Sequence, residues 1–116
     1  VKAGGVLELT LYWQALGEME RSYIVFVHLL DERNQIWGQK DTIPGGGSMP
    51  TTGWVEGEVI TDRYEIMVMP EAPAGRYLLE CGLYLAETGE RLPVFDMAEE
   101  SWGDRLLLPI EIEVNP

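Results

Sequence analysis

The sequence contains little of the chemistry on which most catalytic and metal sites depend. It has one cysteine, Cys81, and one histidine, His28, among 116 residues. A single cysteine excludes an internal disulfide, and one histidine with one cysteine at no useful spacing disfavours a zinc site. No serine stands in a G-x-S-x-G turn of the kind that exposes a nucleophile. We therefore predict that the chain is not an enzyme and has no catalytic residue, cofactor or metal site.

Positive charge is also scarce. Eight Lys and Arg face 20 Asp and Glu, which gives a formal net charge of -12. Because phosphate backbones and anionic lipid heads are bound mainly by cationic side chains, nucleic acid and anionic membrane surfaces are disfavoured partners. No apolar run approaches the roughly 18–20 residues that cross a bilayer, so membrane insertion by this segment is not expected.

The remaining composition is that of a folded protein. Hydrophobic residues make up 46% and charged residues 24% of the chain. This length suits one domain over residues 1–116, because domains most often run to roughly 100–150 residues. The chain starts at Val1 without an initiator methionine, and we expect it to be a segment of a longer protein.

Apolar residues recur with the period of β-strands. Leu7, Leu9, Leu11 and Trp13 alternate with more polar neighbours, as in a half-buried strand. The stretch from 22 to 31 is apolar on both faces, which is typical of a central strand. Strands are predicted at 6–13, 22–31, 36–41, 58–69, 76–86, 91–96 and 105–114. Pro109 in the last of these favours an edge strand or a bulge.

About seven strands, regular turn signals and no convincing helix predict an all-β fold. We expect an antiparallel β-sandwich of immunoglobulin or fibronectin type, with a jelly roll as the alternative. Residues 42–57 carry two prolines and five glycines, which forbid a regular element. A loop of this length is either a functional site or a long crossover between sheets.

Three residue types invite a catalytic or metal interpretation, and each has a structural alternative that we prefer. His28 lies inside an apolar strand, where we expect a structural side chain, and if it is buried beside Asp41 or another carboxylate we expect that pair to be structural. Cys81 is predicted to be an inert residue of the core. The abundant carboxylates produce pairs by chance, and no D-x-[DN]-x-[DN]-G loop supports calcium binding.

The tryptophans in or beside loops are the best candidates for a ligand site. A sugar ring stacks its apolar face on an aromatic plane, while carboxylates and amides bind its hydroxyl groups. The predicted ligand-binding residues are Trp37, Gln39, Asp41, Trp54, Asp62, Trp102 and Asp104. The alternative is that each tryptophan plugs one end of the sandwich and gives its N–H a single partner.

Nearly the whole chain also resembles a little-characterised β-sandwich module. The segments that carry the resemblance are YWQAL (12–16), YIVFVHLLD (23–31), GQKDTIPGGGSMPTTGW (38–54), GEVITDRYEI (57–66), PAGRYLLECGLYLAETGERLPV (73–94) and GDRLLL (103–108). The module is found at the extracytoplasmic C-terminal end of some bacterial multi-pass membrane proteins of the mannosyltransferase-like or related glycosyltransferase type. The resemblance implies an accessory domain outside the membrane, anchored through its parent protein. It also implies a turn at Gly75 followed by a corner tyrosine at Tyr77, and carries over no catalytic residue.

Two functions follow as hypotheses. The first is a non-catalytic accessory domain that binds carbohydrate beside a membrane glycosyltransferase. The second is a structural or protein-interaction module that docks through an exposed strand edge at 105–114. A proteinase inhibitor is a third interpretation, with only the long loop behind it.

Overall fold

The computed structural model describes residues 1–95 and 103–116 and is all-β there. The described residues form six strands, and one short 3-10 turn lies between the third and the fourth. The strands are β1 (Val6–Gln14), β2 (Ile24–Leu30), β3 (Ile36–Thr42), β4 (Val59–Met67), β5 (Gly75–Tyr84) and β6 (Leu106–Val114), and the turn η1 is Thr51–Gly53. None of the described residues forms a helix long and apolar enough to cross a bilayer.

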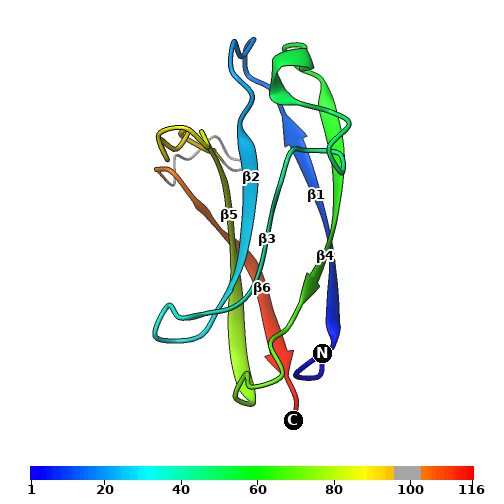
Figure 1. Cartoon of the computed structure of the whole chain (residues 1–116), viewed down its shortest axis with the longest axis vertical. Helices are drawn as coiled ribbons and strands as arrows, with labels where there is room; N and C mark the ends of the chain where they lie inside the picture. The colour runs from blue at the N-terminus through cyan, green and yellow to red at the C-terminus, as the bar shows by residue number, and fades with distance from the viewer. Residues whose placement is uncertain (96–102) are drawn as a thin grey trace.

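The strands form two antiparallel sheets that pack face to face (Figure 1). One sheet has the order β1-β4 and the other has the order β3-β2-β5-β6. The predicted antiparallel β-sandwich is thus confirmed. The long segment after β3 crosses from the four-stranded to the two-stranded sheet, which explains the breakers within residues 42–57.

The alternation in the sequence decides which side chains form the core. Val25, Val27 and Leu29 of β2 meet Ile66 of β4 and Leu79 of β5, and all five are fully or almost fully buried. β2 lies between β3 and β5, and its other face buries Phe26 and Leu30. The prediction of a central strand covered on both sides is confirmed.

At the end where both termini lie, backbone hydrogen bonds link the two sheets along both edges of the sandwich, beside β6 and beside β3. Residues 1–3 pair in parallel with the end of β6 through Lys2 and Asn115. On the opposite side the Met69 N–H donates to the Trp37 carbonyl, next to the point where Gly38 approaches the Met67 carbonyl. We call this the hairpin end, because it also carries the turn between β2 and β3 (Figure 1).

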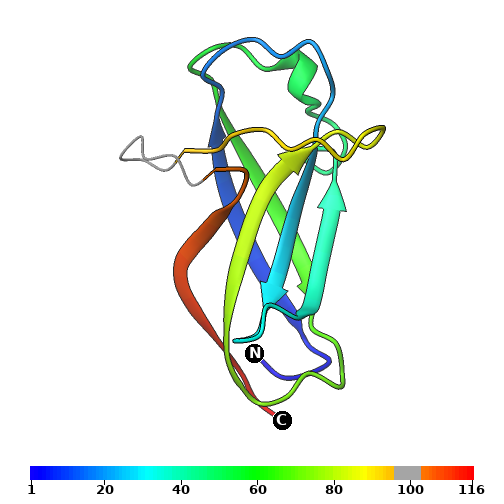
Figure 2. The ribbon, with the colours of Figure 1, turned by 90° about the vertical axis from the view of Figure 1, so that its left-hand side faces the viewer.

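The structure corrects two details of the strand predictions. The described part of the stretch expected as a strand at 91–96 forms only isolated bridges, one of them between Arg91 and Tyr84. Glu80 does lie on the outward face of β5, but it is only 7% exposed. Both differences have one cause: the segment after β5 folds across the outer face of the four-stranded sheet (Figure 2).

Candidate functional site

The predicted ligand-binding residues do not converge on one site. Trp54 and Asp62 lie inside the end of the sandwich that carries η1. Gln39, Asp41 and Asp104 lie on or beside the outer face of the four-stranded sheet, Trp37 lies at the hairpin end, and Trp102 is outside the described residues.

Trp54 and Asp62 present no surface to a ligand. Trp54 is 5% exposed, and its indole N–H donates to the Met49 carbonyl at 2.9 Å. This is the end plug considered as the alternative for the tryptophans. Asp62 is fully buried and accepts hydrogen bonds from the Gly45 N–H at 2.9 Å and from the Tyr64 hydroxyl. Its carboxylate fixes the glycine-rich loop in place.

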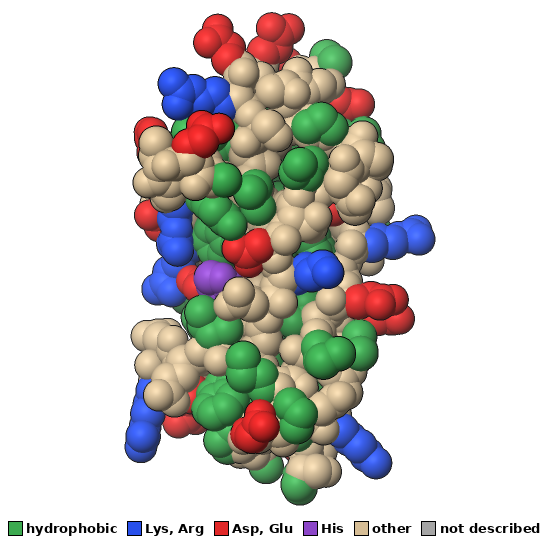
Figure 3. Space-filling model, in the orientation of Figure 1, with side chains coloured by type: hydrophobic (Ala, Val, Ile, Leu, Met, Phe, Trp, Pro, Cys, Tyr) green, Lys and Arg blue, Asp and Glu red, His purple; other side chains and the backbone are tan. Residues whose placement is uncertain are grey.

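The outer face of the four-stranded sheet carries a cluster of charged and aromatic residues. We define the outer-face cluster as Phe26, His28, Glu80, Arg91, Asp104 and Arg105. His28 Nδ1 and Arg105 lie 2.8 Å from the two oxygens of Glu80. Because an ionised carboxylate only accepts, His28 Nδ1 is the protonated donor. Figure 3 shows the histidine at the molecular surface with charged side chains around it.

Two further contacts hold the segment after β5 against this face. The Arg91 guanidinium lies 4.5 Å from the centre of the Phe26 ring, a cation–π contact, and 3.7 Å from Asp104. Next to the cluster, the Tyr84 hydroxyl donates to Asp41 at 2.8 Å, and this carboxylate raises the pKa of Tyr84. Asp41 is therefore engaged with the sheet rather than with His28. The carboxylate beside His28 is that of Glu80.

The electrostatics of Glu80 reflect these partners. Burial alone would raise the pKa of Glu80, but hydrogen bonds from Arg105 and His28 outweigh burial and lower the pKa below its usual 4.5. The cluster links β2, β5 and the start of β6 through one ionised carboxylate.

We expect Glu80→Gln to reduce the free energy of unfolding by about 1–2 kcal/mol near neutral pH, because the amide is uncharged and offers one acceptor oxygen where the carboxylate offers two, to His28 and to Arg105. A carboxyl whose pKa is lowered by folding stabilises fully above its unfolded pKa, and this contribution is lost as the pH falls through the folded value. The difference between wild type and variant should therefore shrink below pH 4.5. Urea denaturation from about pH 7 to about pH 3 measures it.

Glu111→Gln is the matched control, because Glu111 meets Arg76 at 3.9 Å with both side chains largely exposed. Exposed pairs contribute little, so this variant should stay within about 0.5 kcal/mol of wild type. A Glu80→Gln effect that does not change with pH would contradict the role given to its charge.

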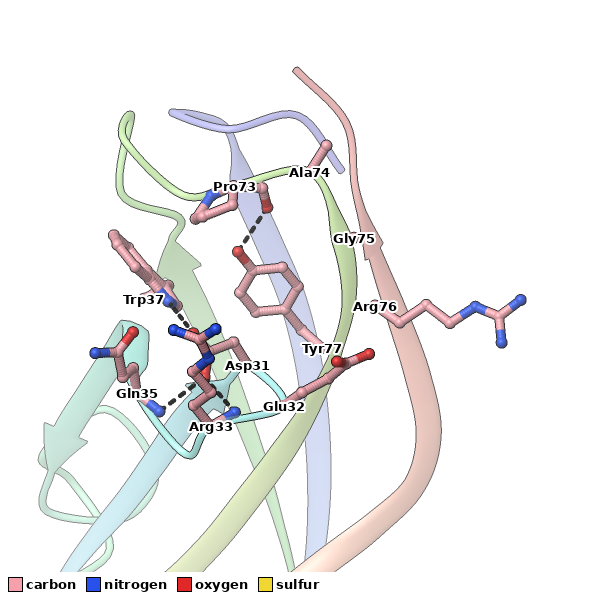
Figure 4. A pocket seen from close by; sticks show the side chains of 10 residues that line it. All are labelled: Asp31, Glu32, Arg33, Gln35, Trp37, Pro73, Ala74, Gly75, Arg76 and Tyr77. Atoms are coloured by element: carbon pink, nitrogen blue, oxygen red, sulfur yellow. Dashed lines mark hydrogen bonds between the residues drawn. The ribbon is translucent and has the colours of Figure 1, made fainter.

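Of the predicted ligand residues, Trp37 lines a pocket at the hairpin end. The hairpin pocket has a volume of about 310 Å³ and lies between the β2–β3 turn and the residues that begin β5. Its walls are Trp37 and Tyr77, which are aromatic, and polar side chains from the turn (Figure 4). The lining residues are Asp31, Glu32, Arg33, Gln35, Trp37, Pro73, Ala74, Gly75, Arg76 and Tyr77.

Asp31 builds the turn and positions the tryptophan. One of its oxygens accepts the backbone N–H groups of Arg33 and Gln35 at 2.8 and 2.9 Å, and the other accepts the Trp37 indole N–H at 2.9 Å. These bonds lower the pKa of Asp31, with the indole as the largest cause. Asn34 takes the left-handed conformation that the turn requires, at φ 61°. The pocket is therefore preorganised by local hydrogen bonds.

The opposite wall is fixed by the start of β5. The Tyr77 hydroxyl donates to the Pro73 carbonyl at 2.6 Å, which ties the strand to the turn before it. This confirms the corner tyrosine that the resemblance implied. Trp37 is half-buried, with its N–H engaged and part of its ring left accessible in the pocket wall.

Reasoning from sequence missed most of the hairpin pocket. Arg33, Gln35 and Arg76 drew no attention, because turn residues are usually solvated. A signal was nevertheless present: an aspartate six residues before a tryptophan, across a turn with Asn34, can bond the turn and the indole together. Among residues 1–95 and 103–116, no group of three or more His, Cys, Asp and Glu is placed to hold a metal ion.

Comparisons of the chain with protein families, curated proteins and solved structures found no match.

Proposed function

We propose that this domain is a non-catalytic accessory β-sandwich that binds carbohydrate in the hairpin pocket. The observation that carries the proposal is the half-buried Trp37 ring in a preformed pocket whose other side chains are hydrogen-bonding groups. Concave sites that combine an aromatic wall with a few polar groups are the usual form of small-ligand sites.

The strand order supports an immunoglobulin-like type of sandwich. The orders β3-β2-β5-β6 and β1-β4 correspond to strands C′CFG and BE of an immunoglobulin-like sandwich, and Tyr77 matches the tyrosine corner at the start of strand F. We assign the fold to that type. Loops at the ends of such sandwiches commonly carry binding residues on a rigid scaffold.

A non-catalytic role is supported by the surroundings of the histidine. His28 Nδ1 bonds Glu80, which is the contact that orients the base in a hydrolytic triad. Among residues 1–95 and 103–116, however, the other ring nitrogen of His28 has no hydrogen bond to a hydroxyl or thiol that could serve as the nucleophile. On the sequence resemblance, we place the domain outside the membrane, as part of a membrane-anchored glycosyltransferase-like parent.

We expect Trp37→Ala to abolish oligosaccharide binding while the domain remains folded. Loss of a stacked aromatic platform removes contact area that no other pocket residue replaces. A glycan array followed by isothermal titration with each responding sugar measures the effect, and circular dichroism checks the fold.

Tyr12→Ala is the matched control. Tyr12 is an aromatic residue of β1 that is 71% exposed and lies outside the pocket. Its removal should leave the titration unchanged. Equal loss in both variants, or silence of the wild type across the array, would refute carbohydrate binding at this pocket.

Protein docking along β6 is the second candidate. β6 is an edge strand, and the segment that pairs with its free side in the described residues, 1–3, reaches only its C-terminal end. Exposed edges pair readily with an added strand. A mass that rises with concentration in sedimentation experiments, together with no response on the array, would favour this function.

A further inference from the structure

We infer that the hairpin pocket selects a saccharide bearing a carboxylate, such as a uronic acid, and that Arg33 binds that carboxylate. This inference rests on the proposed function and adds the class of ligand and the residue that recognises it.

The first step concerns the hydrogen-bonding groups that the pocket leaves free. Neutral sugars need acceptors for their hydroxyl protons, and a carboxylate is the usual acceptor. Asp31 already takes three N–H donors, two on one oxygen and one on the other. The exposed side chains at the rim are Glu32, Arg33 and Gln35. Glu32 only accepts and Gln35 can do both, whereas Arg33 only donates, so Arg33 is the group that would select a ligand bearing a charged acceptor.

The second step concerns the position of the guanidinium groups. Figure 4 shows the Arg33 side chain reaching up between Trp37 and Tyr77, whereas the Arg76 side chain points away from the pocket. Arg76 is also near Glu111, at 3.9 Å. Arg33 has no ion pair within 4.0 Å among residues 1–95 and 103–116. Its charge helps to lower the pKa of Asp31, but its planar fork forms no ion pair there and can bind a carboxylate through two parallel hydrogen bonds.

The third step decides between a carboxylate and a phosphate. The pocket lining contains Asp31 and Glu32 against Arg33 and Arg76, so the local formal charges cancel, and the chain as a whole carries -12. A phosphate ester adds about -1.5 to -2 near neutral pH, about twice the repulsion of a uronate. The field of the protein thus favours the singly charged ligand.

The test compares three monosaccharide probes on the intact domain by isothermal titration: galacturonate, neutral galactose and galactose 1-phosphate. Wild type should bind the uronate most tightly, and Arg33→Gln should weaken that binding at least about tenfold, which corresponds to one lost charge-assisted pair. Arg76→Gln removes the same charge from a side chain that points away, and should change the affinity less than about twofold.

The outcomes separate the inference from the proposed function. Equal binding of galactose and galacturonate, lost in Trp37→Ala but unaffected by Arg33→Gln, would overturn the carboxylate selectivity and leave carbohydrate binding standing. Tighter binding of the phosphate would overturn the choice of anion. No binding of any sugar, here and on the array, would overturn both.

Discussion

Gly82→Ala should lower the free energy of unfolding by about 3 kcal/mol, at the upper end of what one added methyl group costs in a packed site. A Cβ atom at Gly82 would lie 2.6 and 2.7 Å from two carbons of the Phe26 ring and 2.9 Å from the Asp104 carbonyl oxygen. One neighbour is a rigid ring and the other is backbone, so neither can yield cheaply. Gly82 therefore lets the segment after β5 lie flat on the outer face of the sheet.

Urea denaturation of two further variants tests whether steric overlap is the cause. Gly17→Ala adds the same methyl group where no atom lies within 4 Å, and should stay within about 0.5 kcal/mol of wild type. Phe26→Leu removes the ring, so in the double variant the Gly82→Ala cost should fall by more than half. Additive costs in the double variant would show that the clash is not with Phe26.

The layout of the sheets could be predicted because it depends on local alternation. The sets Leu7, Leu9, Leu11 and Tyr77, Leu79, Cys81 point inward in the structure, as their spacing of two requires. The central position of β2 followed from its two apolar faces. The inward-facing residues and the central position of β2 can be predicted from each strand's own sequence, without knowing which side chains pack against it.

The outer-face cluster could not be predicted for the opposite reason. Glu80 occupies an outward position of β5, where alternation predicts solvent, and it is buried by a segment up to 25 residues further along the chain. Phe26 is likewise covered from outside, by Arg91. Contacts of this kind depend on where the segment after β5 runs over the sheet. That path produces no periodic pattern of apolar residues in the sequence.

The candidate site illustrates the same limit. Proximity to loops selected both Trp37 and Trp54 as candidates, with the end plug preferred for Trp54, and the structure shows Trp54 turned inward beneath η1 while Trp37 lines an open pocket. The difference comes from hydrogen bonds formed after folding, to the Met49 carbonyl in one case and to Asp31 in the other. Composition around the two tryptophans does not distinguish them.

Asp62→Ala should lower the free energy of unfolding by about 3 kcal/mol, because it leaves one buried and one partly buried donor without an acceptor at roughly 1–3 kcal/mol each. The donors are the Gly45 N–H and the Tyr64 hydroxyl. Burial and the carboxylate raise the pKa of Tyr64, so the phenol stays protonated and donates. Gly45 belongs to a run of three glycines with positive φ, a backbone that other residues rarely adopt and that Asp62 fixes at one point.

The control variants separate this role from the loss of an acidic side chain. Glu65→Ala removes an exposed carboxylate from the same strand and should cost less than about 0.5 kcal/mol. Tyr64→Phe removes one of the two donors, so combining it with Asp62→Ala should cost less than the sum of the single changes. Amide hydrogen exchange should locate the remaining loss in residues 43–49. An Asp62→Ala domain that unfolds within 1 kcal/mol of wild type, about one lost hydrogen bond, would mean that the loop holds its shape without the carboxylate.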